Sequence, residues 1–169
     1  MAITYEPIAT TTLGSAAASY TFSSISSAYT DLVLVAVGTV STNGDSLIVR
    51  FNSDTATNYS NTSVRGSGTT ATSSRSTGST SLFLGYGAGF SSTEICNAIM
   101  NIQNYANATT FKTTISRVNN PNGSVGPGTE AVVGLWRATP AAITSVLIGS
   151  QSGTMSTGMT LTLYGIKAA

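Results

Sequence analysis

Alternation of apolar and polar side chains is the dominant pattern along this chain. In the segment 46–52 (SLIVRFN), Leu47, Val49 and Phe51 fall on one face of an extended strand, and the residues between them fall on the other. The segment 110–118 (TFKTTISRV) alternates in the same way. A period of two residues is typical of a β-strand that buries one face.

Segments of this kind recur between turn-forming stretches such as NGD and NNPNGSVGPG, and no window has the apolar spacing of an amphipathic helix. This arrangement predicts an all-β fold, an antiparallel two-sheet β-sandwich of jelly-roll type with about eight or nine strands. An immunoglobulin-like sandwich is the alternative, but its Cys and Trp framework is missing. The predicted strands are 19–22, 31–40, 46–52, 81–86, 95–104, 110–118, 130–138, 143–149 and 159–166.

Three parts of the chain depart from simple alternation. LVLVAV (32–37) is apolar on both faces, which predicts a central strand covered on both sides. The Ser/Thr-rich stretch 53–80 predicts a long, exposed, partly mobile loop with one irregular edge strand around 62–65, because a domain boundary there would leave neither half a sandwich. We therefore expect one β-sandwich domain over 19–169, preceded by an extended N-terminal arm, residues 1–18, that can reach over a neighbouring subunit.

Composition narrows the class of protein. Serine and threonine account for 53 of the 169 residues, charged residues for only 8%, and the net charge is +1. A near-neutral chain lacks the basic stripe of a nucleic-acid binder and the polybasic patch of a membrane-surface protein. So few charges suit a subunit held in an assembly. The N-terminus has no signal-peptide pattern, and no apolar run reaches membrane-spanning length, so we expect a soluble protein made in the cytoplasm.

Residues for catalysis are scarce. The chain has no histidine, which excludes Ser-His-Asp and Cys-His mechanisms and the common zinc sites. Its six carboxylates fall near predicted strand ends or in loops, where they normally cap turns, and Cys96 has no partner for a disulfide. Asn52, Asp54 and Asn58 have calcium-like spacing but only one charge, which favours a hydrogen-bonded loop over a metal site. We predict no enzyme activity and no cofactor.

Arginines and aromatic residues are the candidate contact groups. Three arginines lie in predicted strands next to Phe51, Val118 and Trp136, where they either face solvent or help to anchor a subunit interface, since Arg and Trp are enriched there. Tyrosines in loops either stack on sugars or close the core. The candidate interface residues are Arg50, Arg65, Arg75, Arg117, Trp136, Arg137, Tyr59 and Tyr105; Tyr86 is a further loop tyrosine.

A recurring set of short motifs carries a family resemblance. The motifs, in order, are RFN with Asp54 and Asn58-Tyr59, a Thr/Ser-rich loop containing an Arg, Asn104-Tyr105 leading to Lys112, GLWR at 134–137 before Ile143-Thr144, and a final LYGI at 163–166. Together they resemble a family of small β-sandwich structural proteins of tailed bacteriophages, including cyanophages. The resemblance covers roughly residues 19–167.

The resemblance implies a virion component without catalytic residues. The first expectation is a capsid decoration (cement) protein, a homotrimer that binds the major capsid protein on the outer head surface and is made in the host cytoplasm. The alternative is a receptor- or glycan-binding module of a tail fibre or baseplate. Within the Ser/Thr-rich loop, Arg75 is the expected point of contact with a neighbour.

Overall fold

The computed structural model describes residues 4–121 and 128–167, and these form two antiparallel β-sheets with no helix among them. Two sheets that each have one apolar face bury those faces by packing against each other, and this gives a sandwich. The strands are β1 (Tyr5–Thr12), β2 (Ser19–Phe22), β3 (Asp31–Gly38), β4 (Leu47–Phe51), β5 (Tyr59–Gly66), β6 (Ala71–Ser79), β7 (Leu82–Phe83), β8 (Cys96–Ile102), β9 (Lys112–Asn120), β10 (Gly128–Trp136), β11 (Val146–Ser150) and β12 (Thr160–Ile166).

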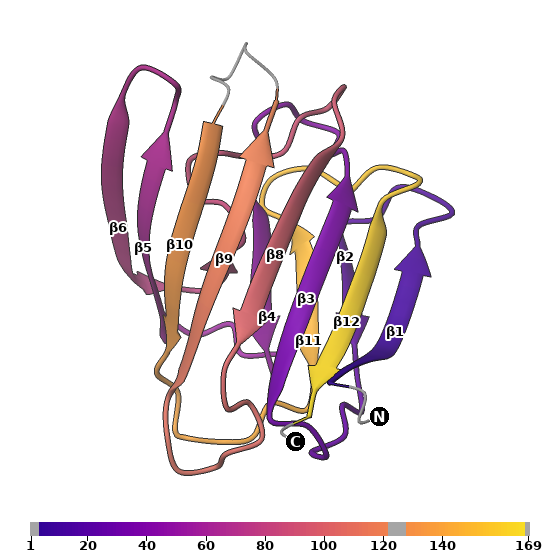
Figure 1. Ribbon diagram of the computed structural model, residues 1–169, viewed down its shortest axis with the longest axis vertical. Coiled ribbons are helices and arrows are strands. Elements are labelled where there is room, and N and C mark those ends of the chain that lie inside the picture. Colours follow the sequence, from indigo (N-terminus) through magenta and orange to yellow (C-terminus); the bar gives the residue numbers. More distant parts are fainter. Residues whose placement is uncertain (1–3, 122–127, 168–169) are drawn as a thin grey trace.

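The sheets differ in width. The larger one has eight strands in the order β1-β12-β3-β8-β9-β10-β5-β6, and the smaller has four in the order β2-β11-β4-β7. Figure 1 shows the eight-stranded sheet in front, with the smaller sheet behind its central part. The wide sheet therefore has one face turned towards the smaller sheet, its inner face, and one turned away, its outer face.

The strand order is that of a jelly roll with additions. When the eight strands of a jelly roll are numbered along the chain, one sheet has the order 1-8-3-6 and the other 2-7-4-5. Taking β2, β3, β4, β5, β6, β7, β8 and β11 as those eight gives β2-β11-β4-β7 and β3-β8-β5-β6, which are the observed orders apart from the β9–β10 hairpin between β8 and β5. β12 and β1 extend the wide sheet beyond β3. The predicted all-β, jelly-roll sandwich is confirmed, although the described residues form twelve strands where eight or nine were predicted.

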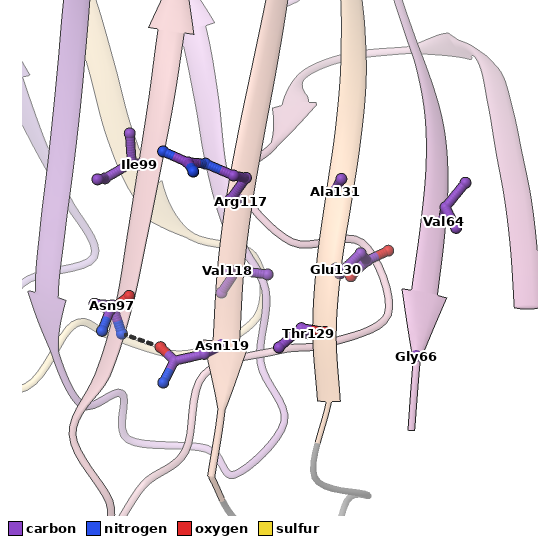
Figure 2. A pocket seen from close by; sticks show the side chains of 10 residues that line it. All are labelled: Val64, Gly66, Asn97, Ile99, Arg117, Val118, Asn119, Thr129, Glu130 and Ala131. Atoms are coloured by element: carbon purple, nitrogen blue, oxygen red, sulfur yellow. Dashed lines mark hydrogen bonds between the residues drawn. The ribbon is translucent and has the colours of Figure 1, made fainter. Parts of the chain in front are cut away.

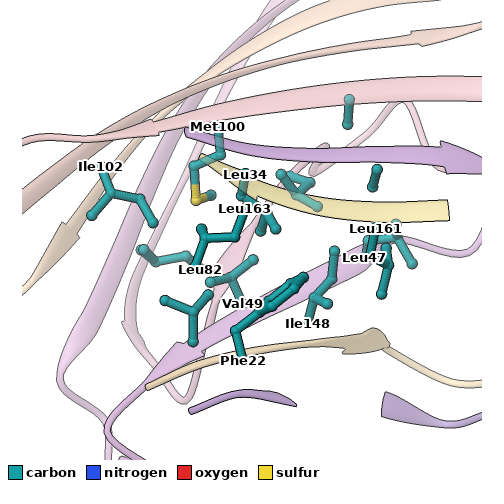
Figure 3. Packing of buried hydrophobic residues seen from close by; sticks show 14 of the residues in the cluster. Phe22, Leu34, Leu47, Val49, Leu82, Met100, Ile102, Ile148, Leu161 and Leu163 are labelled. Carbon is teal, nitrogen blue, oxygen red and sulfur yellow. The ribbon is translucent and has the colours of Figure 1, made fainter. Parts of the chain in front are cut away.

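The core lies between the sheets. Leu34, Met100 and Leu163 project from the wide sheet, and Val49 and Ile148 project towards them from the small one (Figure 3). All five side chains are fully buried. Alternation places them there, because every second residue of β3, β8, β12, β4 and β11 points to the same side of its sheet.

The Ser/Thr-rich stretch 53–80 differs most from its prediction. It was expected to be a long loop with one irregular edge strand around 62–65. That strand lies within β5, which is not at the edge, and the stretch also contains all of β6, which pairs with β5. Gly68, at a positive φ of 88°, lies in the turn between them, and Gly78, at 65°, marks the bulge where the register shifts. β6 lies at the sheet edge with both faces largely exposed. Most of its side chains are Ser or Thr, so no apolar alternation reveals it in the sequence.

Other boundaries moved by smaller amounts. Within the expected arm 1–18, β1 pairs with β12 at the other edge of the wide sheet, and Glu6 and Lys167 form an ion pair of 2.8 Å there. The predicted strand 81–86 shortens to β7, and the one predicted over 143–149 begins later, as β11. β3 is central as predicted, but its outer face is covered only in part: Val33 is buried, whereas Val35 and Val37 are partly exposed.

A pair of substitutions tests the assignment of the two faces of β3. Leu34→Ala is expected to lower the free energy of unfolding by about 3 kcal/mol, because it leaves a cavity in a fully buried site. Val35→Ala, on the outer face of the same strand, is expected to cost about 1 kcal/mol or less. Urea denaturation of both variants measures the difference, and equal losses would contradict the assignment.

Candidate functional site

The outer face of the wide sheet is the most distinctive surface of the molecule. On β9 and β10 buried and exposed positions alternate almost without exception, because inner-face residues lie beneath other chain segments while outer-face residues have no layer above them. A face that packs only against water normally carries polar side chains. Here the outward positions of β5, β9 and β10 include the exposed residues Val64, Ile115, Ala131 and Val133, and Ile99 on β8 is half-buried beside them.

These apolar residues are neighbours because of the strand register. Val133 lies opposite Ile115, and Ala131 lies opposite Val64. Val64 is 61% exposed, Val133 53% and Ile115 41%. Isolated exposed hydrophobic residues are ordinary, whereas a contiguous set on one face is characteristic of an interaction surface.

Arg117 lies at the centre of a shallow depression of about 610 Å³ on this face. Figure 2 shows its side chain extending from β9 towards Ile99, its partner on β8. Asn97, Asn119 and Thr129 form the polar end of the depression, and the Asn119 Oδ1 accepts a hydrogen bond from the Asn97 backbone N at 2.9 Å. The site therefore offers a mainly apolar floor, one guanidinium and a few amide and hydroxyl groups.

The charge on this half of the outer face is positive. Arg117 is exposed on β9, and Arg75 is exposed on β6, where it lies opposite Thr62. The carboxylate that these strands carry, Glu130, points inward and is buried. Its Oε2 accepts hydrogen bonds from the backbone N of Gly87 and of Ala88, at 2.8 and 2.6 Å, and so fixes the glycine-rich turn beneath the sheet.

The buried aromatic candidates lie elsewhere. Trp136, Tyr59 and Tyr105 are at most 4% exposed and belong to the core, so the structure does not place them at an interface on this chain. Tyr59 stacks on Trp136 with ring centroids 6.4 Å apart. The Tyr105 hydroxyl donates to the backbone carbonyl of Ser26. Of the two interpretations that the sequence left open for the tyrosines, core closure is correct for Tyr59 and Tyr105.

Asp54 anchors this aromatic cluster. Its carboxylate accepts hydrogen bonds from the indole Nε1 of Trp136 at 2.7 Å, the side chain of Asn58 at 2.9 Å and the backbone N of Ala56 at 2.9 Å. Burial works to raise the pKa of Asp54, but the three donors outweigh it and lower the pKa below its usual value. Burial is also the main reason that the pKa of Tyr59 rises to about 12. The stretch 52–58 is thus a hydrogen-bonded loop, as favoured from the sequence.

The remaining arginines are dispersed. Arg65 lies opposite the buried Glu130 on the inner side of β5, against Gly87. Arg137 is exposed just after β10. Arg50, on the outer side of the small sheet, donates from Nε to the carbonyl of Thr80 at 2.9 Å. The eight candidates therefore do not form one site, and only Arg75 and Arg117 share the outer face of the wide sheet.

A second depression, of about 520 Å³, lies on the outer side of the small sheet next to the end of β6. Arg50, Tyr86 and Gln151 line it together with Ile48 and Phe83. Tyr86 is 37% exposed and meets Phe83 edge to face, with centroids 5.0 Å apart. An exposed aromatic ring beside a guanidinium and an amide resembles the groups that hold a sugar ring.

The exposed apolar residues Val64, Ile115 and Val133 were missed as site candidates. The sequence did contain a signal for Ile115, which shares its side of β9 with Thr113 and Arg117. Val133 shares its side of β10 with Ala131 and Leu135, so the pattern alone did not show that this side faces outward. Within the described ranges, no cluster of Cys, Asp and Glu could hold a metal ion, and no helix could span a bilayer.

Comparison with known proteins gives few similarities. No protein-family model and no curated protein matches the chain. A crystal structure of Scytalido-glutamic peptidase with a peptide-based transition state analog overlaps 91% of this chain at 11% identity and a TM-score of 0.25, and this chain covers 64% of the peptidase chain. The CBM2 module of the Lactobacillus casei BL23 phage J-1 evolved Dit overlaps 89% of this chain and 69% of its own, at 9% identity and a TM-score of 0.23. Overlaps this poor do not define a shared fold or function.

The lowered pKa of Asp54 gives a pH prediction. The stabilisation is fully present above the unfolded-state pKa of about 3.9 and is lost as the pH falls through the lower folded-state pKa. Asp54→Asn is therefore expected to be less stable than the wild type at pH 7 by about 2 kcal/mol and to lose less stability between pH 5 and pH 2. Urea denaturation over that range measures both, and parallel pH profiles would contradict the role given to Asp54.

Proposed function

We propose that this protein is a structural component of a tailed-phage virion, a capsid decoration protein that binds the outer head surface and stabilises it. The resemblance of the RFN, GLWR and LYGI motifs to phage β-sandwich proteins supplies the class. The exposed apolar outer face of the wide sheet, around Arg117, is the observation that supports a protein-binding role.

The size of this face suits a protein partner. Eight strands at about 4.8 Å spacing and about 25 Å length give a face of roughly 850 Å², close to the area of about 800 Å² that each partner buries in a standard protein interface. β3, the strand that is apolar on both sides, lies within it, and Val35 and Val37 on its outer side are partly exposed. A partner layered on this face would give β3 the two-sided burial that its sequence predicts.

The charges indicate what the partner surface carries. Arg117 and Arg75 face outward without a carboxylate on the described outer side of β8, β9, β10, β5 or β6. Burying an arginine without a counter-charge is costly, so a matching surface supplies carboxylates next to its apolar groups. The major capsid protein is the proposed partner, and the homotrimer implied by the resemblance remains a prediction.

A pair of variants tests head binding through this face. Heads from a phage that lacks this gene product are mixed with purified protein and sedimented. Wild-type protein is expected to bind in hundreds of copies per head, and Val133→Asp, which places a charge in the apolar patch, is expected to bind at least tenfold more weakly. The matched control Thr21→Asp, on the exposed side of β2 in the other sheet, is expected to bind like the wild type. Failure of the wild type to bind would overturn the proposal.

The Tyr86 depression favours a second candidate, a glycan-binding module of the phage tail. Stacking of Tyr86 on a sugar, with Arg50 and Gln151 beside it, would hold host surface polysaccharide. In this case the copy number per virion is expected to be in single or low double figures. Isothermal titration with purified polysaccharide is then expected to give binding that Tyr86→Ala abolishes and that Tyr5→Ala, an exposed tyrosine on β1, leaves intact. A titration in which no heat of binding is detected would count against this candidate.

A further inference from the structure

The two sheets have four edge strands, and three of them are poor templates for further pairing. β1 contains Pro7 and a register shift just after it, β2 is four residues long, and β7 is two residues long. Proline, bulges and shortness are, with charged side chains, devices by which soluble proteins prevent edge-to-edge association, and Arg75 is the one charge on β6. β6 has none of the three over most of its length; it is nine residues long, has no proline, and is regular from Ala71 to Thr77.

The turn before β6 shows which of its backbone groups are free. The backbone N of Ser67 donates to the carbonyl of Thr70 at 2.9 Å, so these two residues form a hydrogen-bonded pair at the end of the hairpin. Such pairs alternate with non-hydrogen-bonded pairs along antiparallel strands. Residues 72, 74 and 76 therefore direct their N–H and C=O groups to β5, while residues 71, 73, 75 and 77 direct theirs away from it.

We infer that β6 pairs antiparallel with β6 of a second copy of this chain. The four residues with outward groups, 71, 73, 75 and 77, are symmetric about Ser74. A two-fold axis at Ser74 therefore places 71 opposite 77 and 73 opposite 75 of the second copy. Every one of these residues then lies in a pair that exchanges both N–H···O=C bonds.

Side chains favour the same register. A two-fold axis at Arg75 would set two arginines directly opposite each other, which is unfavourable, whereas the axis at Ser74 sets Arg75 opposite Ser73. The paired positions are otherwise Ala, Ser and Thr, which fit between adjacent strands without large apolar groups. Residues 71 to 75 are all exposed, so nothing described in the chain covers this edge.

The consequence is a sheet that runs continuously through two molecules and joins their outer faces side by side. The inference is independent of the proposed function. It is compatible with a simple dimer or with a two-fold link between homotrimers, and in either case loss of the contact halves the mass of the particle.

A proline substitution tests the contact. Ser73→Pro removes one outward N–H but no hydrogen bond to β5, and proline is tolerated at a sheet edge. In sedimentation equilibrium the wild type and Ser73→Ala are expected to have twice the mass of Ser73→Pro, with unchanged β-sheet circular dichroism in all three. Equal masses of the wild type and Ser73→Pro at every concentration would overturn the inference.

A cysteine pair tests the register and does not depend on the proline variant. Across the proposed axis Ser74 faces its own copy in a non-hydrogen-bonded pair, with Cα atoms about 4.5 Å apart, a separation suited to a disulfide. Thr72, on the same face of β6, would lie about 13 Å from its copy. With oxidised glutathione, Ser74→Cys is expected to form a disulfide-linked dimer and Thr72→Cys is not, because only the Ser74 positions are close enough across the axis. The native Cys96 is buried and does not interfere with the comparison. Equal cross-linking of the two, or none, would overturn the inference.

Discussion

Burial of apolar side chains between two sheets of unequal width is the interaction on which the rest of this structure depends. The small sheet supplies Val49, Ile148 and Leu47, and the central strands of the wide sheet supply the opposing half of the core. Four strands cannot cover eight, so the inner side of β10 and β5 needs other cover. The glycine-rich turn that Glu130 holds by two backbone hydrogen bonds lies there. The buried carboxylate of Glu130 thus holds in place the segment that covers the part of the wide sheet beyond the reach of the small sheet.

This architecture leaves recognition mainly to backbone, hydroxyl and apolar groups, with Arg117 and Arg75 as the charged groups on the outer face of β9 and β6. With charged residues at 8% of the chain, long-range electrostatic steering is weak, and contacts made through Val133, Ile115 or the edge of β6 depend little on salt. Affinity in such a system comes from area and from many simultaneous weak contacts. The role proposed above would draw on this, because in a layer of many copies each contact can be modest while the whole layer is stable.

The sequence predicted the fold well where side chains alternate between water and core. β4 and β12 appear close to their predicted positions because each buries a face of Leu, Val or Phe side chains. β9 also appears where alternation predicted a strand, but its faces are reversed, because Lys112, Thr114 and Ser116 point inward and Ile115 points outward. β6 could not be predicted in this way, since neither of its faces is buried and its strand state depends on pairing with β5. Among the candidate site residues, Trp136 is four residues from Val132 on β10, so alternation already placed both on the same side of the strand, and Val132 is buried. The enrichment of tryptophan at interfaces favoured an exposed Trp136, but its side chain is buried in the core.

The pairing of β1 with β12 sets a condition on how the molecule folds. Tyr5 lies opposite Ile166, so the edge of the wide sheet joins residues at nearly opposite ends of the described chain. β3, near the start, likewise needs β12 as one of its two neighbours. During synthesis β3 therefore has an unpaired, strongly apolar side until β12 has emerged from the ribosome. Contacts of such long sequence separation form slowly, and β12, the last of the described strands along the chain, is needed to complete the wide sheet.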